Sequence, residues 1–274
     1  MACEQGALYC YQNRYFPLSP PMAHKAYIKF KNLLPASLKE ALSSINQRFF
    51  ARRTLQRKYG SWFEVDWRKK FRTMSDEEWI RAYDDVWKNH HNDCLDETDS
   101  DLILGAIAKT SQRTQTPIST VLEIGCGYGT LAIAMTKAGY GVTCLDVSKE
   151  ALRKAEERAK GENAQITWHQ GFAENIPFPD KSFDVITCCH TLEHVKDLSQ
   201  TVNAMKRVAR LAVVVLVPKQ RFRLYAENYH TQFFSTQEDL IRTFGLSDYE
   251  CIEIDCIEHE GEFQGEALFY VGYI

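Results

Sequence analysis

A short glycine-rich segment in the middle of the chain constrains the fold more than any other part of the sequence. The apolar residues of 121–124 suit a buried strand, and Gly125, Gly127 and Gly129 follow them. Because glycine has no Cβ atom, it lets the backbone turn sharply and approach a ligand closely. The apolar residues of 131–135 then suit the buried face of a helix. The segment therefore predicts a strand, a glycine loop and a helix at the edge of a sheet where ligands bind.

Two acidic residues flank this loop and indicate the charge of its ligand. Glu123 lies two residues before the first glycine, and Asp146 ends the next apolar segment, 141–146. An acid beside a pyrophosphate-binding loop would repel its ligand, and Gly-x-Gly-x-Gly differs from the nicotinamide fingerprint Gly-x-Gly-x-x-Gly. An acid at the end of the second strand is placed to accept hydrogen bonds from ribose hydroxyls. The arrangement favours a nucleoside that carries positive charge and no phosphate.

The rest of the chain alternates between strand and helix patterns. We expect strands near 119–124, 141–146, 165–169, 183–189, 211–217, 248–256 and 266–273, and helices near 76–88, 98–112, 129–138, 148–160, 197–209 and 235–243. The first of these helices follows an N-cap signal, Ser75-Asp76-Glu77-Glu78. This order predicts an α/β fold with a doubly wound, mostly parallel, seven-stranded sheet. We expect the last two strands to form an antiparallel hairpin at the sheet edge.

These features resemble the class I S-adenosylmethionine-dependent methyltransferases, and in particular their type 11, ubiquinone-biosynthesis-like, small-molecule group. The similarity covers roughly residues 99–274. It rests on four ordered matches: the glycine loop with its two acids, the segments 172–178 and 182–186, the element His190-Thr191-Leu192-Glu193-His194-Val195, and the segment 230–235. The resemblance implies a Rossmann-like methyltransferase domain at 97–274. It also implies S-adenosylmethionine as the cofactor and S-adenosylhomocysteine as the product.

By this resemblance, one set of residues would surround the cofactor. Glu123 would lie near the methionine amino group, the glycine loop would pass beneath the cofactor, and Asp146 would bind the ribose. Many relatives carry an Asp where this chain has Phe172, which cannot accept a hydrogen bond from the adenine amino group. The backbone of Ala173, the carboxylate of Glu174 and stacking on an aromatic ring are the open alternatives for adenine. The expected cofactor-binding set is Tyr83, Trp87, Glu123, Gly125, Cys126, Gly127, Gly129, Asp146, Val147, Phe172, Ala173, Glu174 and His190.

Histidines are the candidates for proton removal. Transfer of a methyl group from a sulfonium requires alignment and exclusion of water, and a hydroxyl or amine acceptor must also lose a proton. Histidine accepts a proton near neutral pH, so we expect His190 or His230 to be the catalytic base. His194 lies in a family element where a structural role is common. The residues expected to line the acceptor pocket are His194, Tyr225, Tyr229, Phe233 and Phe234.

The first 75 residues differ from the remainder in charge. They hold fourteen Lys and Arg against four Asp and Glu, although the whole chain has a net charge of −3. The remaining residues therefore contain 19 basic and 32 acidic side chains. A helix with an apolar face is predicted over 37–50. We expect residues 1–96 to form a basic helical cap, in which Tyr83 and Trp87 cover the cofactor as a lid. A solvated cap, contact with an anionic lipid surface and binding of an acidic, phosphorylated or carrier-linked substrate are open alternatives for the basic arm.

Several classes of protein are disfavoured by the sequence. No apolar stretch approaches the roughly 20 residues that cross a bilayer, and the N-terminus lacks a secretory segment. Nine scattered cysteines are typical of a reducing compartment, so we expect a cytoplasmic protein. No nucleic-acid module is recognisable. No metal site is expected, because His90 and His91 are adjacent, point in different directions and lack a second pair at zinc spacing.

The sequence thus predicts transfer of a methyl group to an oxygen or nitrogen of a small molecule. The acceptor would be a metabolite, a natural product or a glycan precursor. An RNA or protein methyltransferase and a non-catalytic regulator that binds the cofactor are the alternatives. The oligomeric state stays open.

Overall fold

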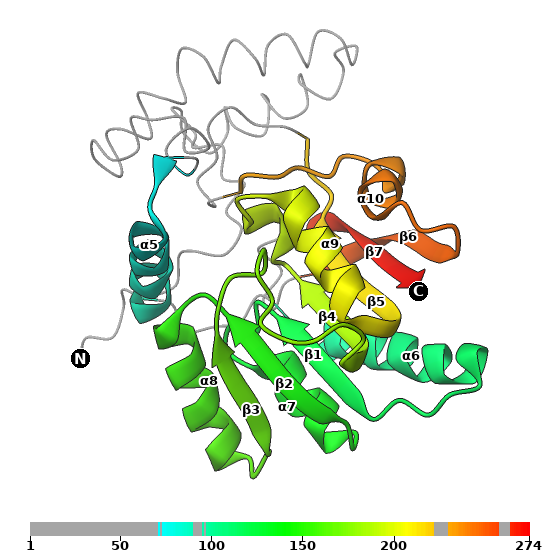
Figure 1. Ribbon diagram of the computed structural model, residues 1–274, viewed down its shortest axis with the longest axis horizontal. Coiled ribbons are helices and arrows are strands. Elements are labelled where there is room, and N and C mark those ends of the chain that lie inside the picture. The colour runs from blue at the N-terminus through cyan, green and yellow to red at the C-terminus, as the bar shows by residue number, and fades with distance from the viewer. Residues whose placement is uncertain (1–70, 72, 90–94, 96, 222–229, 258–263) are drawn as a thin grey trace, which may run out of the picture. The chain divides into compact units, whose positions relative to one another are not determined.

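The computed structural model describes residues 71, 73–89, 95, 97–221, 230–257 and 264–274 (Figure 1). All of these residues belong to one of the two compact units into which the chain divides. The helix predicted over 37–50 and the basic arm before Phe71 lie outside the described residues. The following description concerns the first unit alone.

A seven-stranded sheet forms the centre of this unit. Its strands are β1 (Thr120–Ile124), β2 (Gly141–Asp146), β3 (Ile166–Gln170), β4 (Phe183–Cys189), β5 (Ala209–Pro218), β6 (Tyr249–Ile257) and β7 (Gln264–Tyr273). They lie in the order β3-β2-β1-β4-β5-β7-β6. Strands β1 to β5 pair in parallel, whereas β7 is antiparallel to both β5 and β6. The order confirms the predicted doubly wound, mostly parallel sheet and its antiparallel edge hairpin.

Helices cover both faces of the sheet (Figure 1). They are α5 (Asp76–Asn89), α6 (Glu97–Thr114), α7 (Thr130–Lys137), α8 (Lys149–Gly161), α9 (Leu198–Val208) and α10 (Gln237–Phe244), with a 3₁₀ turn, η3 (Leu192–His194). Leu122 and Ile124 pack into a buried cluster with residues of α9 and α10, whereas Val121 joins a second cluster with α6 and α7. Successive residues of a strand point to opposite faces, so the apolar residues of β1 contribute to both layers. Among the described helices, none combines the length and apolar character that a bilayer span requires.

Helix α5 begins at the predicted N-cap and packs on α8. The Ser75 hydroxyl accepts a hydrogen bond from the backbone of Glu78, and the Glu78 carboxylate accepts one from the backbone of Ser75. Farther along α5, Asp84 Oδ1 accepts hydrogen bonds from Ser148 Oγ at 2.6 Å and from the backbone of Glu150 at 3.2 Å. These contacts fix α5 at the N-terminus of α8, next to the end of β2.

Candidate active site

The glycine loop and the segment after β4 lie at the point where the strand order reverses. The chain runs outward from β1 to β2 and β3, and then returns to β4 on the opposite side of β1. Ligands of doubly wound sheets bind at such a point, beyond the carboxyl ends of the strands. The loop after β1 and the histidine-containing element after β4 are therefore placed together by the topology.

Gly125 joins these two segments directly. Its φ angle is +70°, and a Cβ atom at this position would lie 2.0 Å from Oγ1 of Thr191. The Thr191 hydroxyl is itself fixed, because it donates a hydrogen bond to the carbonyl oxygen of Cys189 at 3.0 Å. Only glycine satisfies both the backbone conformation and the available space. The loop thus packs without a gap against the residue that follows His190.

Asp146 holds the other side of the loop. Its carboxylate is buried at the end of β2 and accepts hydrogen bonds from the backbone N–H groups of Gly127 at 3.1 Å and Ser148 at 2.9 Å. These two bonds orient the carboxylate, and a carboxylate oxygen can accept more than one hydrogen bond. Val147, the next expected cofactor residue, is half-buried, and its carbonyl oxygen accepts a hydrogen bond from Gln170.

Glu123 is buried within the sheet, two residues before the loop. Cys144 Sγ donates to Glu123 Oε2 at 3.9 Å. Burial and the neighbouring Glu123 charge raise the pKa of the Cys144 thiol to about 11, so the thiol keeps its proton. Cys126 is also buried in the core, and a hydrogen bond with Cys144 together with burial raises the pKa of its thiol well above the ordinary value. Cys126 can therefore meet a ligand only through its backbone.

The segment expected to surround adenine is tied to the start of α9. Glu174 Oε1 accepts hydrogen bonds from the backbone of Lys196 at 2.7 Å and of Asp197 at 3.3 Å. The Lys196 ammonium lies 5.4 Å from the centre of the Phe172 ring. Ala173 packs against the core. One carboxylate oxygen of Glu174 is thus committed to the backbone of 196–197.

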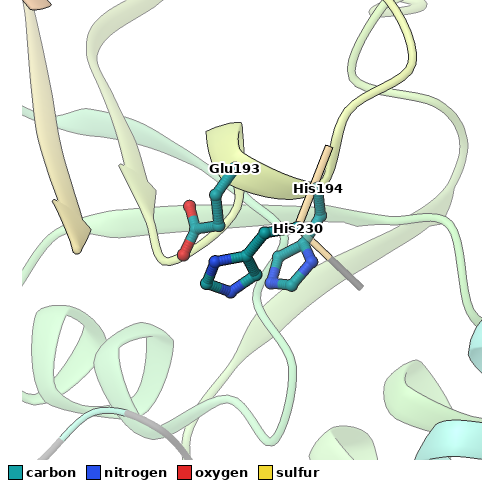
Figure 2. Close-up of side chains that lie close together, drawn as sticks. All are labelled: Glu193, His194 and His230. Carbon is teal, nitrogen blue, oxygen red and sulfur yellow. The ribbon is translucent and has the colours of Figure 1, made fainter. Parts of the chain in front are cut away.

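A carboxylate and two imidazoles come together beyond β4 and β5 (Figure 2). Glu193 and His194 lie on η3, whereas His230 begins the segment that leads to α10, and their ligand atoms all lie within 4.8 Å of one another. The rings of His194 and His230 meet edge to face, with centroids 4.7 Å apart. The backbone N–H groups of Thr231 and Gln232 donate to the carbonyl oxygen of Glu193 at 2.7 and 3.0 Å. Two expected site residues, far apart in the sequence, are therefore neighbours.

His190 lies beside this group. Its φ angle is +48°, which is uncommon for a residue with a side chain, and its N–H donates to the carbonyl oxygen of Leu216 at 2.8 Å. Its Nδ1 is 3.6 Å from Glu193 Oε1. Glu193 is not among the site residues predicted from the sequence. In the sequence, Glu193 is marked only by its place between His190 and His194. That segment is too short to show a helical period.

Helix α5 brings two of the expected cofactor residues to the same region. The Tyr83 ring meets the His194 ring edge to face at 6.1 Å, and the Trp87 ring lies 6.0 Å from that of Tyr128 in the glycine loop. Of the expected acceptor residues, Phe233 is half-buried, whereas Tyr225 and Tyr229 lie outside the described residues. Phe234 is buried in the core cluster and is part of the packing of α10 on the sheet.

Comparison with known proteins shows what the central part of the chain is similar to. The family described as a methyltransferase domain matches residues 122–216, which run from β1 to β5. Over residues 122–216 the chain is therefore similar to this methyltransferase family. The match contains the glycine loop, both flanking acids and the His190–His194 element of this methyltransferase domain.

Individual relatives are similar to this chain over about a third of its length. An uncharacterized methyltransferase, YcgJ of Bacillus subtilis, is 34% identical over 109 residues, which cover 39% of this chain and 42% of that protein. A ubiquinone biosynthesis O-methyltransferase of Alkalilimnicola ehrlichii is 36% identical over 91 residues, covering 33% and 37%. Each match thus spans less than half of the relative's own length. Among solved structures, the [4+2]-cyclase SpnF has the same fold, with a TM-score of 0.53, 15% identity and coverage of 72% of this chain and 96% of that chain.

The residues of the methyltransferase domain fit its cofactor, S-adenosylmethionine. At Gly129, where φ is +78°, a Cβ atom would lie 3.1 Å from the Ala155 side chain. The loop is thus closely packed at Gly129 as well as at Gly125. The carboxylates of Glu123 and Asp146 give this edge of the sheet a negative charge, which suits a cofactor with a sulfonium and an amino group. A pyrophosphate group next to the loop would be repelled by Glu123.

Proposed function

We propose that this protein is an S-adenosylmethionine-dependent methyltransferase whose acceptor is an oxygen or nitrogen of a small molecule. The observation that carries the proposal is the packing of Gly125 against Thr191, because it joins a cofactor loop to an element rich in proton-accepting side chains. The name of the relative from Alkalilimnicola ehrlichii, an O-methyltransferase, supports oxygen as the acceptor atom. A metabolite, a natural product or a glycan precursor is the proposed class of acceptor.

The proposed roles at the cofactor follow from charge and backbone geometry. S-adenosylmethionine, when bound, supplies the methyl group and a good leaving group. Asp146 accepts hydrogen bonds from the ribose, the glycine loop lies beneath the cofactor, and Glu123 provides negative charge for the methionine amino group. Tyr83 and Trp87 exclude water from the region, with support from their ring contacts to His194 and Tyr128. Residues 1–96 are proposed to act as a cap, of which α5 is the described part.

His190 is the proposed base. Its side chain is 11% exposed, and its imidazole lies beside the Glu193 carboxylate, which stabilises the imidazolium that forms when the acceptor loses its proton. His230 is only 2% exposed and lies with Nδ1 at 2.6 Å from Gln220 Oε1. This burial favours a positioning role for His230. The backbone of His190 has a positive φ angle, and strain of this kind is found at catalytic positions.

The proposal also covers the cellular location of the protein and the role of its basic arm. A cytoplasmic location is supported by the free cysteines of the described residues, namely Cys126, Cys144, Cys188, Cys189 and Cys251. Contact of the basic arm with an anionic surface or an acidic substrate stays a prediction, since the arm lies outside the described residues.

Binding and turnover of labelled S-adenosylmethionine test the proposal. Calorimetry should show binding by the wild-type chain, and Asp146→Ala should weaken it by about 1.5–3 kcal/mol, roughly 10- to 100-fold, because charge-assisted hydrogen bonds are lost. Asp180→Ala is the matched control, since this acid is exposed and precedes the first residue of β4, whereas Asp146 ends β2. Unchanged affinity in Asp146→Ala, or a preference for NAD, contradicts the cofactor assignment.

The acceptor is then sought by incubating the protein with methyl-labelled cofactor and a cell extract. Label in a small molecule supports the proposed function. Label that is lost on nuclease or protease treatment identifies an RNA or protein methyltransferase instead. Binding of the cofactor without any labelled product favours the non-catalytic regulator.

A further inference from the structure

We propose that Glu193, His194 and His230 bind a divalent transition-metal ion. They offer one carboxylate oxygen and two imidazole nitrogens, all within 4.8 Å of one another, from two segments that meet only in the fold (Figure 2). This combination of ligands suits Zn²⁺, Fe²⁺ and related ions better than Mg²⁺ or Ca²⁺, which prefer oxygen ligands alone. The adjacent histidines at 90 and 91 lie outside the described residues.

The state of Glu193 is the first independent observation in favour of a cation. Its side chain is 1% exposed, and among the described residues neither carboxylate oxygen receives a hydrogen bond. The nearest basic atom, Nδ1 of His190, lies 3.6 Å away, which is longer than a hydrogen bond. A buried carboxylate is strongly unfavourable unless it is paired or coordinates a metal. A cation between Glu193 and the two imidazoles would supply the missing partner.

The contact between His230 and Gln220 is the second observation. Nδ1 of His230 lies 2.6 Å from Gln220 Oε1. An amide oxygen only accepts hydrogen bonds, so Nδ1 carries the proton and Nε2 keeps its lone pair. Metal-binding histidines almost always donate their other N–H to an acceptor of this kind, which fixes the ring and its ligand atom. Gln220 therefore has the role of a residue that orients a ligand.

The site needs only small movements to close on an ion. Metal bonds to nitrogen and oxygen of about 2.0–2.2 Å place neighbouring ligand atoms about 3.4 Å apart in a tetrahedral site. The ligand atoms already lie within 4.8 Å of one another, and rotation of the side chains can close the difference. Three protein ligands leave at least one position open. The backbone beneath is fixed by the hydrogen bonds from residues 231 and 232 to Glu193.

The open position suggests what the ion does. A hydroxyl oxygen of the acceptor that binds there would be polarised and held close to His190, the proposed base. This part of the inference rests on the proposed methyl transfer, whereas binding of the ion does not. The preferred class of acceptor then becomes a compound with a hydroxyl group rather than an amine.

Metal binding is tested on the full-length, tag-free protein after treatment with a chelator. Calorimetry with Zn²⁺ and visible absorption with Co²⁺ should show one ion per chain, and metal analysis after dialysis should confirm the ratio. Glu193→Gln and His230→Ala should each weaken binding at least 100-fold. His169→Ala is the matched control, because His169 is a half-buried histidine of β3 outside the cluster, and it should bind as the wild type does. Gln220→Ala keeps every ligand and should weaken binding about 10- to 100-fold.

Each possible outcome supports or overturns the metal site. Absence of stoichiometric binding, a thiolate band in the Co²⁺ spectrum, or equal affinity in Glu193→Gln and wild type overturns the proposal. If Glu193→Gln does not fold, as judged by circular dichroism, the metal affinities of His230→Ala and Gln220→Ala take its place. Calorimetry with S-adenosylmethionine on the metal-free protein separates the two proposals: loss of the metal site with intact cofactor binding refutes only this one, and lack of cofactor binding refutes the proposed function.

Discussion

Replacing Gly125 by alanine should destabilise the protein for two separable reasons. The residue has a φ angle of +70°, and its new Cβ atom would lie 2.0, 2.6 and 2.8 Å from Oγ1, Cγ2 and Cβ of Thr191. An L-residue in the left-handed region costs about 1–2 kcal/mol. An added carbon in a filled space costs about 1–3 kcal/mol. We therefore expect Gly125→Ala to lower the free energy of unfolding by about 2–5 kcal/mol.

Two other glycines serve as matched controls for these terms. Gly139 has a φ angle of +96°, but a Cβ atom there would meet nothing within 4 Å, so Gly139→Ala measures the conformational cost alone. Gly105 lies inside α6 with open space around it, and Gly105→Ala should stabilise the protein by about 0.5–1 kcal/mol. The difference in unfolding free energy between Gly125→Ala and Gly139→Ala isolates the steric cost, which we expect to be about 1–3 kcal/mol.

Guanidinium unfolding of the three variants and the wild type gives these differences. A double-mutant cycle with Thr191→Gly adds a direct test, because that change removes the three atoms that would lie nearest to the new Cβ. In the Thr191→Gly background, Gly125→Ala should cost no more than Gly139→Ala. The reasoning is refuted if Gly125→Ala and Gly139→Ala are equally destabilising in the wild-type background, since the loop would then not be packed against Thr191.

Two further predictions concern chemistry and pH. His190→Ala should lower kcat by about 10²–10⁴-fold with nearly unchanged cofactor affinity, while His169→Ala retains wild-type turnover; normal kcat in His190→Ala would mean that alignment alone carries the reaction. Burial tends to raise the pKa of Asp184, but hydrogen bonds from Ser119 and Thr120 and the charge of Arg210 outweigh it and lower the pKa. A lowered folded-state pKa contributes stability above the unfolded value, which is lost as the pH falls through the folded one. Asp184→Asn should thus cost about 1–3 kcal/mol at pH 7, by urea unfolding, and this gap should shrink below about pH 4; a gap that stays constant would rule out Asp184 ionisation as its source.

The sheet and its cofactor loop could be predicted because their signals are local. Strands buried on both faces are nearly continuous apolar runs, as in 211–217 and, interrupted by Glu123 alone, in 121–124, and the bend after β1 requires glycine in the sequence itself. The acid at the end of β2 lies a fixed distance along the chain from that bend. Each of these features depends on the residue types of a short segment, so one sequence is enough to find them.

The cluster around Glu193 could not be predicted in the same way. Its meeting with His230 depends on backbone hydrogen bonds between η3 and residues 231 and 232, and no sequence period reports such contacts. The charge shift near residue 75 located the basic arm, but it gave no sign that Asp84 binds the N-terminus of α8. Tertiary hydrogen bonds of single polar side chains are the part of a site that pattern analysis misses.

The contact between the glycine loop and Thr191 makes the two halves of the site mechanically dependent. Thr191 lies between His190 and Glu193 in the sequence. Its side chain occupies the space that a Cβ atom of Gly125 would need. A shift of the loop toward a ligand would therefore move the backbone that carries the proposed base and two of the proposed metal ligands. In-line transfer depends on distances that a displacement of about 1 Å can spoil. Under the proposed function, a packed contact of this kind would hold the methyl donor and the acceptor at a fixed distance from each other, which two independent loops on the same sheet edge would not do.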